Sequence, residues 1–396
     1  MSNLKLLALG DIFLKTKDDF GPFDNIKEVF QNYDIIFGNL ETVLSNRGVQ
    51  APKRVPLRTN PDKIVYLKNT GFDIVNLANN HITDYGESGL LDTMSILKRN
   101  DINFVGAGAN INDALKPVIF ERNELKIGFF GFTSVGTIAK EESSGCASLN
   151  KELIIKCISD LRKKVDILVV SLHWGIEYVF YPSPEQQKLA RTLIDNGADL
   201  IIGHHPHVIQ GIEEYRDKLI IYSLGNCNFG VEQDKKYEGA DIGIMVSVEF
   251  SKDGIPKYEL LPVEINSDYQ PVLLKQNEKA KVLNFIDKIS VPLQNSNINI
   301  KSTFWYEEAS EVYLTSQIES YFIRIRKYRI KHFFMFVRWL INPFTLKMEC
   351  GYLIKKLRRR KLESELRICR EERERADRVS HTIAVQSIKK LSGIPI

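Results

Sequence analysis

The sequence predicts an α/β fold in which parallel strands alternate with helices that cover the faces of the sheet. Two observations predict it. Over residues 1–265, short apolar runs alternate with helix-like stretches, a pattern typical of βαβ units. Several of these runs also end abruptly in His, Asp, Glu or Asn, and in open α/β sheets ligands bind beyond the carboxyl ends of the strands.

Most of the expected strands are continuous apolar runs, because strands of a parallel sheet are covered on both faces. In chain order these runs are Leu4–Gly10, Asp34–Asn39, Phe72–Asn76, Lys126–Phe132, Asp166–Leu172, Ala198–Gly203 and Lys218–Leu224. The expected helices are Asn25–Asn32, Pro61–Asn69, Gly86–Arg99, Lys151–Lys164 and Pro184–Asn196. Two further runs, Ile242–Phe250 and Tyr258–Ile265, predict antiparallel strands joined at Asp253-Gly254, a dipeptide typical of turns.

The rest of the chain divides into two segments of different composition. Residues 266–309 predict a linker or irregular connection, because they show little periodicity and contain many Ser, Asn and Gln. Residues 310–396 predict a basic α-helical segment. Residues 301–396 carry 21 Lys and Arg against 11 Asp and Glu, whereas residues 1–300 carry 33 against 39. This asymmetry favours an anionic partner for the C-terminal segment, and a solvated charged helix is an equally open alternative.

Composition excludes several classes of protein. With 43% hydrophobic and 26% charged residues, the chain is not disordered, collagen-like or a small disulfide scaffold. Its five cysteines include no CxxC pair, which favours a reducing compartment. The N-terminal stretch lacks the pattern of a signal peptide, and no apolar run reaches the ~18 residues that span a bilayer. We therefore expect a cytoplasmic protein that can sit peripherally on the inner membrane face.

Residues of the kinds that bind metals gather at the ends of the expected strands. The chain has seven His, and five of them follow strands: His81, His173, His204, His205 and His207. Asp11 and Glu41 follow two other strands. A single His in such a place is usually structural, but five His with two carboxylates favour a metal centre. Imidazole, carboxylate and amide oxygen together suit Mn, Fe, Zn or Co better than Ca.

The same residue types predict a hydrolytic chemistry. Two divalent ions ~3.5–4 Å apart can lower the pKa of a water and hold both oxygens of a displacement. A protonated His just outside the metal ligands can donate to the leaving oxygen, and His81, next to Asn80, is placed for that role. Asp84 and Glu177 are carboxylates that can fix the tautomer of a His ring in the same motifs.

Seven motifs, in matching order and spacing, resemble those of the CapA family of bacterial capsule-synthesis and poly-γ-glutamate-synthesis proteins. They are GDIFL, GNLET, GFDIVNLANNHITDYG, GAGAN, SLHWGIEY, GADLIIGHHPHVIQGIE and YSLGN, and the resemblance covers residues 4–265. No single motif would suffice. The resemblance implies a calcineurin-like, metallophosphoesterase-like fold of layered sheets flanked by helices, with the metal centre at the strand ends.

The resemblance also implies roles for individual residues. The implied ligands of two divalent ions, Mn, Fe or Zn, are Asp11, Glu41, Asn80, His173, His205 and His207, with His204 as an extra residue. His81, assisted by Asp84, is the implied catalytic acid. Substrate contacts are expected from Arg58, Asn39, Glu177 and Asn226, although Arg58 can equally be a surface arginine.

Two departures from the resemblance concern residues beside the expected centre. Asp11-Ile12-Phe13 lacks the His of the Asp-x-His motif usual in phosphoesterases, which implies that one metal position is weaker or empty. Cys227 stands where the family has an aromatic residue, and nothing near it in the sequence marks it as a nucleophile.

Two functions therefore remain open. One is a metal-dependent, phosphoesterase-like hydrolase tied to capsule or exopolymer synthesis, whether of poly-γ-glutamate or polysaccharide. The other is a non-catalytic polymer-binding or assembly protein of a membrane-associated capsule synthesis complex. The basic, aromatic stretch 320–361 favours docking on such a complex or on an anionic membrane surface. Nucleic acid is an unlikely partner, because no recognised nucleic-acid motif is present.

Overall fold

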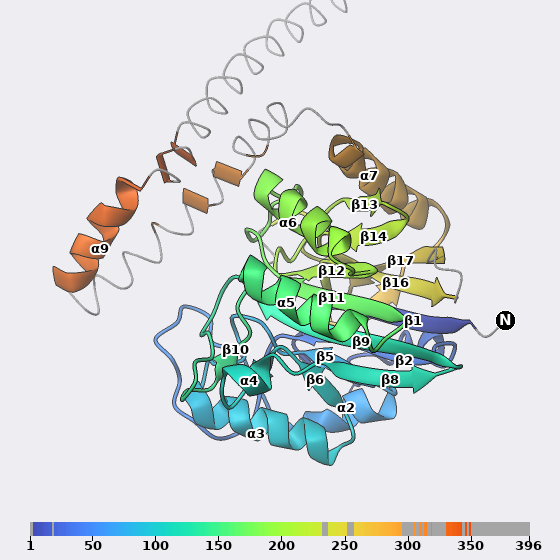
Figure 1. Ribbon diagram of the computed structural model, residues 1–396, viewed down its shortest axis with the longest axis horizontal. Helices are drawn as coiled ribbons and strands as arrows, with labels where there is room; N and C mark the ends of the chain where they lie inside the picture. The colour runs from blue at the N-terminus through green and yellow to red at the C-terminus, as the bar shows by residue number, and fades with distance from the viewer. Residues whose placement is uncertain are drawn as a thin grey trace, which may run out of the picture.

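The computed structural model describes residues 3–17, 20–231, 237–251 and 257–294, together with 305, 309–310, 313–314, 318, 330–342, 345–346 and 348–349. Two β-sheets pack face to face in this part of the chain, and helices cover their outer faces (Figure 1). Three clusters of buried apolar side chains separate the layers. The predicted α/β fold of layered sheets flanked by helices is confirmed.

The first sheet combines parallel strands with an antiparallel edge. Its order is β18 (Pro271–Leu273), β17 (Lys257–Ile265), β16 (Ile242–Phe250), β1 (Leu4–Ile12), β2 (Ile35–Leu40), β5 (Ile74–Asn76) and β6 (Asn103–Val105). The short strand β15 (Asn226–Asn228) pairs with the end of β1. β1, β2, β5 and β6 run parallel, whereas β16, β17 and β18 are antiparallel to their neighbours.

The second sheet has a parallel centre and two antiparallel edges. Its order is β13 (Ile212–Tyr215), β14 (Lys218–Ile221), β12 (Leu200–His204), β11 (Ile167–His173), β9 (Leu125–Thr133) and β8 (Val118–Arg122). β14, β12, β11 and β9 are parallel, so their carboxyl ends lie at one edge of the sheet. Two small ribbons complete the set: β3 (Val43–Leu44) with β4 (Arg58–Thr59), and β7 (Ala107–Gly108) with β10 (Gly145–Cys146).

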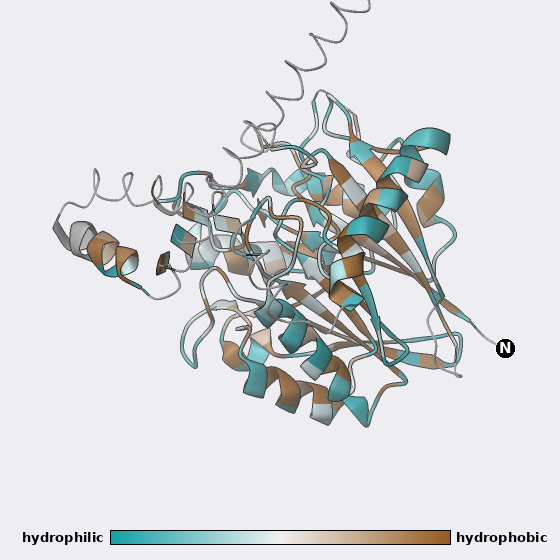
Figure 2. Ribbon diagram, turned by 90° about the horizontal axis from the view of Figure 1, so that it is seen from above, coloured by the Kyte–Doolittle hydropathy of each residue, from teal (hydrophilic) through white to brown (hydrophobic). Residues whose placement is uncertain are grey.

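Alternation of side chains along the strands explains the layers. In β1, Leu6 and Ala8 enter the core between the two sheets, while Leu7 and Leu9 face the helices on the other side. Because successive side chains of a strand point to opposite faces, a continuous apolar run buries both faces. Figure 2 shows the result, with apolar colour along the strands and on the sheet-facing sides of the helices.

The helices fall into two outer layers. Against the first sheet lie α1 (Lys27–Phe30), the 3-10 turn Pro61–Lys63 with α2 (Ile64–Asn69), and α3 (Gly86–Arg99). Against the second lie α4 (Ile111–Ala114), α5 (Lys151–Arg162) and α6 (Pro184–Asp195). α6 begins with a capping box between Ser183 and Gln186, and Pro at its first position needs no amide partner. All the predicted helices are present with shifted or identical bounds.

The predicted linker is wrong for residues 271–294. These residues form β18 and then α7 (Gln276–Gln294), which packs against β13 and β17. Ile286, Ile289 and Leu293 repeat at helical spacing and are buried, and the Ser290 hydroxyl accepts a hydrogen bond from the amide of Ile212 at 2.9 Å. The polar composition hid this apolar stripe. The predicted turn at residues 253–254 lies outside the described residues.

Little of the predicted basic segment lies within the described residues. The described part includes α9 (Ile330–Leu340) and Met348, which forms a buried cluster with Val179 and with Trp305 and Ala309 of the predicted linker. Residues 350–396 lie outside the described residues, and the predicted division of the chain at residues 265 and 309 stays a prediction. Among the residues that are described, no helix is both long and apolar enough to cross a bilayer.

Candidate metal centre

The carboxyl ends of both sheets converge on one cluster of polar side chains. From the first sheet come Asp11 in β1, Glu41 after β2, and Asn80 and His81 after β5. From the second come His173 at the end of β11 and the His-Pro-His turn after β12. The parallel register aligns Asp11 with Asn39, and His173 with His204. The predicted ligands are therefore brought together, as convergent strand ends require.

Two buried carboxylates lie at the centre of the cluster. Asn39 donates to Asp11 Oδ1 at 2.8 Å and to Glu41 Oε2 at 3.2 Å. Burial alone would raise the pKa of Asp11, but hydrogen bonds and charge from His204 and His207 hold it well below its ordinary value. Burial and the charge of Asp11 raise the pKa of Glu41 well above its ordinary value. Either a proton on Glu41 or a cation beside both carboxylates can relieve their repulsion in the protein interior.

Three imidazoles face these carboxylates, and burial favours the neutral form of His173 and His205. His173 Nε2 and His207 Nε2 lie 3.6 and 3.8 Å from Glu41 Oε1. The His173 and His205 ring centroids are 4.6 Å apart. Burial lowers the pKa of His205 to about 3, helped by His207, and burial with the neighbouring His205 lowers the pKa of His173 well below its ordinary value. Neutral imidazole is the form that binds a metal.

The backbone of the His-Pro-His turn is strained. His205 has φ +97° and His207 has φ +57°, values that residues other than glycine adopt at a cost of order 1–3 kcal/mol. Pro206 between them fixes its own φ. Asn226 Oδ1 lies 2.9 Å from His207 Nδ1, so Nδ1 carries the hydrogen and Nε2 faces the cluster. The strain is consistent with ligand positions that the surrounding structure imposes.

His81 belongs to a separate hydrogen-bonded group beside the cluster. Its Nδ1 lies 2.6 Å from Asp84 Oδ2, and its Nε2 lies 3.9 Å from Glu41 Oε1. Lys53 donates to Asp84 Oδ1 at 2.7 Å and to the Asn80 carbonyl at 2.7 Å. Burial lowers the pKa of His81 to about 4, against the raising effect of Asp84. Lys53 is a site residue that sequence reasoning missed, because no motif surrounds it.

The donor set fits a transition-metal ion. Three overlapping groups each place their ligand atoms within 4.8 Å of one another: Glu41, His173 and His205; Asp11, Glu41 and His207; and Glu177, His205 and His207. Buried Glu41 Oε1 and His205 Nδ1 have no hydrogen-bond partner among the described residues. Asn80 Oδ1 lies 2.8 Å from His173 Nε2, so it can join the first group. Mixed imidazole and carboxylate ligands suit Mn, Fe or Zn.

Three of the predicted substrate contacts have other surroundings in the structure. Asn39 is fully buried and orients the two carboxylates, and Asn226 is buried against His207. The Arg58 guanidinium stacks on the Tyr85 ring, 3.4 Å from its centroid, and donates to the carbonyl of Arg47. The polar atoms of Asn39 and Asn226 bind other protein groups, whereas the buried Nε of Arg58 has no hydrogen-bond partner among the described residues. The substrate role of these three residues stays a prediction.

The two departures from the family resemblance, at Phe13 and at Cys227, concern side chains that pack against their neighbours. The Phe13 ring contacts the Phe229 ring, with centroids 5.8 Å apart, so it supplies no donor. Burial raises the pKa of the Cys227 thiol well above its usual range, which agrees with a packing role. The extra His204 lies beneath the cluster, with its Nδ1 3.3 Å from Asp11 Oδ1 and its ring against Phe37. It belongs to none of the three donor groups.

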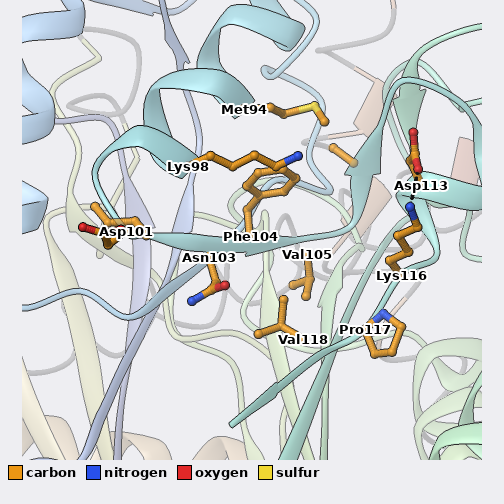
Figure 3. A pocket seen from close by; sticks show the side chains of 12 residues that line it. Met94, Lys98, Asp101, Asn103, Phe104, Val105, Asp113, Lys116, Pro117 and Val118 are labelled. Atoms are coloured by element: carbon orange, nitrogen blue, oxygen red, sulfur yellow. Dashed lines mark hydrogen bonds and ion pairs between the residues drawn. The ribbon is translucent and has the colours of Figure 1, made fainter.

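A pocket of about 520 Å³ lies away from this cluster, between α3, β6 and the strand β8 (Figure 3). Lys98 lies beside the Phe104 ring there, 5.5 Å from its centroid, and Lys116 pairs with Asp113 at 2.7 Å. None of the predicted site residues lines it. Its charged groups are exposed or already paired, so the strand-end cluster remains the candidate site.

Comparison with known proteins agrees with this arrangement. The family model described as bacterial capsule synthesis protein PGA_cap matches residues 5–231, more than half of the chain. The chain belongs to this family. It is 35% identical over 267 residues to the PGA biosynthesis protein CapA of Bacillus subtilis, an alignment that covers 66% of this chain and 69% of that protein. It is 33% identical over 294 residues to the capsule biosynthesis protein CapA of Bacillus anthracis, covering 72% and 68%.

The match to the PGA_cap family contains every element that supplies the candidate centre. Asp11 is the first residue of the cluster in the sequence and Asn226 is the last, and both fall within residues 5–231. The predicted membership of the CapA family is therefore confirmed. Among solved structures, 5'-nucleotidase from Candida albicans superposes with a TM-score of 0.44 at 11% identity, covering 78% of this chain and 58% of that chain.

Proposed function

We propose that the chain is a metal-dependent hydrolase, phosphoesterase-like in its chemistry, that acts in the synthesis of a capsule or exopolymer. The observation that carries the proposal is the buried group of Asp11, Glu41, His173, His205 and His207 at the meeting point of two sheets. Buried carboxylates beside neutral imidazoles are expensive for a fold to keep, because unpaired polar groups in the interior cost free energy. A bound cation removes that cost.

The residues that would hold divalent ions fall into two groups that share Glu41. His173, His205 and the Asn80 amide oxygen are on one side, and Asp11 and His207 are on the other. Ligand atoms of His205 and His207 also lie within 4.8 Å of each other, so one ion can reach both. Bound ions would supply positive charge to phosphoryl oxygens and acidify water. Asn39 and Asn226 hold the carboxylates and the His207 ring in position, so the ligands need little reorganisation.

His81 is suited to move a proton at Nε2. Asp84 accepts the hydrogen of Nδ1, which directs Nε2 toward the cluster. Burial keeps the ring neutral in the free protein, with a pKa of about 4. The negative charge of a bound phosphoester offsets this effect by stabilising the imidazolium, which can then donate from Nε2 to a leaving oxygen. Lys53 keeps Asp84 in place and adds positive charge for an anionic substrate.

A second pocket lies next to the residues of the proposed centre. It has a volume of about 520 Å³ and is lined by Phe229, Tyr237, Tyr269 and Lys17, among others. The Phe229 ring lies 4.7 Å from the His207 ring, so the pocket adjoins the cluster. Lys17 is the basic residue of the lining, beside the acidic residues Glu238 and Asp241, so the pocket itself does not select for an anionic ligand.

Elemental analysis and a phosphoester panel test the proposal. We expect about one to two transition-metal ions per chain in protein purified without chelator, and metal-dependent turnover of at least one phosphoester. The His205→Ala/His207→Ala variant should lose both, while Glu185→Gln, which changes a carboxylate on α6, keeps both. Metal uptake without turnover, together with binding of anionic polymer, would instead favour a non-catalytic assembly protein.

We also propose peripheral attachment, from the cytoplasmic side, to an anionic membrane or to a capsule synthesis complex through residues 320–361. Within that stretch, α9 exposes Met335 and Val337, and Ile341 follows it with 68% of its surface exposed. Sedimentation with vesicles of anionic lipid tests the membrane alternative. Binding that is unchanged in a chain ending at residue 319 would refute it, and recovery of the protein from the culture medium would refute the location.

A further inference from the structure

The loop between β11 and α6 carries a carboxylate toward the metal centre. After His173, Gly175 turns the chain with φ +95°, a conformation that favours glycine. A Cβ there would lie 2.9 Å from Gln186 Nε2. The Trp174 side chain before the turn is buried, and its indole nitrogen donates to the Tyr222 carbonyl at 3.1 Å. The turn is therefore fixed at its start, two residues before Glu177.

Contacts with the His-Pro-His turn fix the other side of the loop. The Tyr178 amide donates to the Pro206 carbonyl at 2.7 Å, and Gln210 Nε2 donates to the Val179 carbonyl at 2.7 Å. Tyr178 has φ +62°, and its ring lies 6.0 Å from that of His207. A residue held in this conformation by neighbouring contacts is typical of a functional loop.

The C-terminal part of the chain packs on the same loop. Val179 is 3% exposed and shares a cluster with Trp305, Ala309 and Met348, which are 0–4% exposed. The segment that carries Glu177 is thus enclosed between the ligand turn and residues more than 120 positions away in sequence. Enclosure of this kind reduces the conformational entropy that Glu177 would lose on binding an ion.

Glu177 lies within ligand distance of two imidazoles. One carboxylate oxygen of Glu177 and one ring nitrogen each of His205 and His207 lie within 4.8 Å of one another. Buried His205 Nδ1 has no hydrogen-bond partner among the described residues. An ion placed between these three atoms would have three protein ligands of a kind that transition metals prefer.

We propose that Glu177 is a metal ligand of the centre, sharing an ion with His205 and His207 rather than contacting substrate. The inference rests on the metal centre of the proposed function and adds a carboxylate from outside the strand ends. It replaces the substrate role expected for Glu177. The loop from Gly175 to Val179 then holds the Glu177 carboxylate in place for that ion.

Metal titration of the full chain tests this inference without reference to turnover. Calorimetric titration with Mn²⁺ or Zn²⁺ would compare wild type with Glu177→Gln, Glu177→Asp and the control Glu185→Gln, which removes a charge from the nearby helix α6. We expect Glu177→Gln to raise the Kd of one ion by about 10-fold or more. Glu177→Asp should restore part of this affinity, and Glu185→Gln should bind both ions as wild type does. The rise in Tm on adding metal should be smallest in Glu177→Gln, intermediate in Glu177→Asp and equal to that of wild type in Glu185→Gln.

The outcomes separate this inference from the proposed function. Wild-type affinity in Glu177→Gln, together with loss in His205→Ala, would overturn the role of Glu177 and leave the centre intact. Weaker metal binding in Glu177→Gln with no turnover of any phosphoester by wild type would support the ligand and refute the hydrolase. Equal metal-free Tm values for wild type and Glu177→Gln exclude misfolding as the cause of weaker binding.

Discussion

Replacing Asp84 by asparagine or alanine tests the group that orients His81. Asp84 is 1% exposed and accepts three hydrogen bonds, from Lys53 Nζ at 2.7 Å, from the Leu57 amide at 2.8 Å and from His81 Nδ1 at 2.6 Å. Hydrogen bonds to a charged group contribute about 1.5–3 kcal/mol each, and a buried donor left without a partner costs about 1–3 kcal/mol. The ion pair with Lys53 counts for less, because that side chain is one-third exposed.

These contacts predict different costs for the two variants. Asp84 Oδ2 accepts from both the Leu57 amide and His81 Nδ1, so Asp84→Asn can keep one oxygen for both donors. Its NH₂ group then faces Lys53 Nζ, and we expect a loss of about 1–3 kcal/mol in the free energy of unfolding. Asp84→Ala leaves the Leu57 amide and the His81 ring without acceptors, and the loss should reach about 3–5 kcal/mol. Asp84→Ala removes the acceptor that fixes the hydrogen on His81 Nδ1, so turnover of that variant should fall by about 10²-fold or more, and Asp84→Asn should lose less.

Urea unfolding at fixed metal concentration measures the loss in the free energy of unfolding. Kinetics with a single substrate measure the loss of turnover, and elemental analysis measures the metal content. Metal content should stay at the wild-type level in Asp84→Asn, because Asp84 belongs to none of the donor groups. Free energies of unfolding within about 0.5 kcal/mol of wild type for both variants would refute the reasoning. So would loss of metal in Asp84→Asn, since the carboxylate would then act on the cluster itself.

Three further predictions address the close packing around the centre. Gly10→Ala should lower Tm by several degrees and reduce metal content, because its Cβ would lie 2.0 Å from the Gly225 carbonyl beside Asp11, and unchanged melting would contradict this. Cys146 should resist iodoacetamide at about pH 8 in the native protein, because burial raises its pKa to about 12, and peptide mapping after brief labelling checks it. Lys53→Met should lower turnover at least ~10-fold with little loss of metal, whereas Arg58→Met should lower Tm and leave turnover unchanged; equal kinetics for the two would reject the assignment.

Local periodicity explains why so much of the fold was predictable. The bounds of α3 match the expected Gly86–Arg99, and β16 matches Ile242–Phe250, because each carries its own apolar pattern. The edge strands β8 and β13 were missed, since they are short and face solvent on one side. α7 was missed because its apolar stripe lies in a polar stretch, although its 3.6-residue spacing was present in the sequence.

The strand-end ligands could be identified without coordinates. Parallel strands of one sheet bring their carboxyl ends to one edge, so Asp11 had to lie near Asn39, and His173 near His204, once their strands were recognised. That Asp11 meets His173 was decided by the packing of one sheet on the other. The residues that surround these ligands could be identified only from the tertiary structure. Lys53 reaches Asp84 while Arg58 stacks on Tyr85, and both come from a stretch without a periodic pattern. The path of such a stretch depends on contacts distant in sequence, and no local rule encodes those contacts.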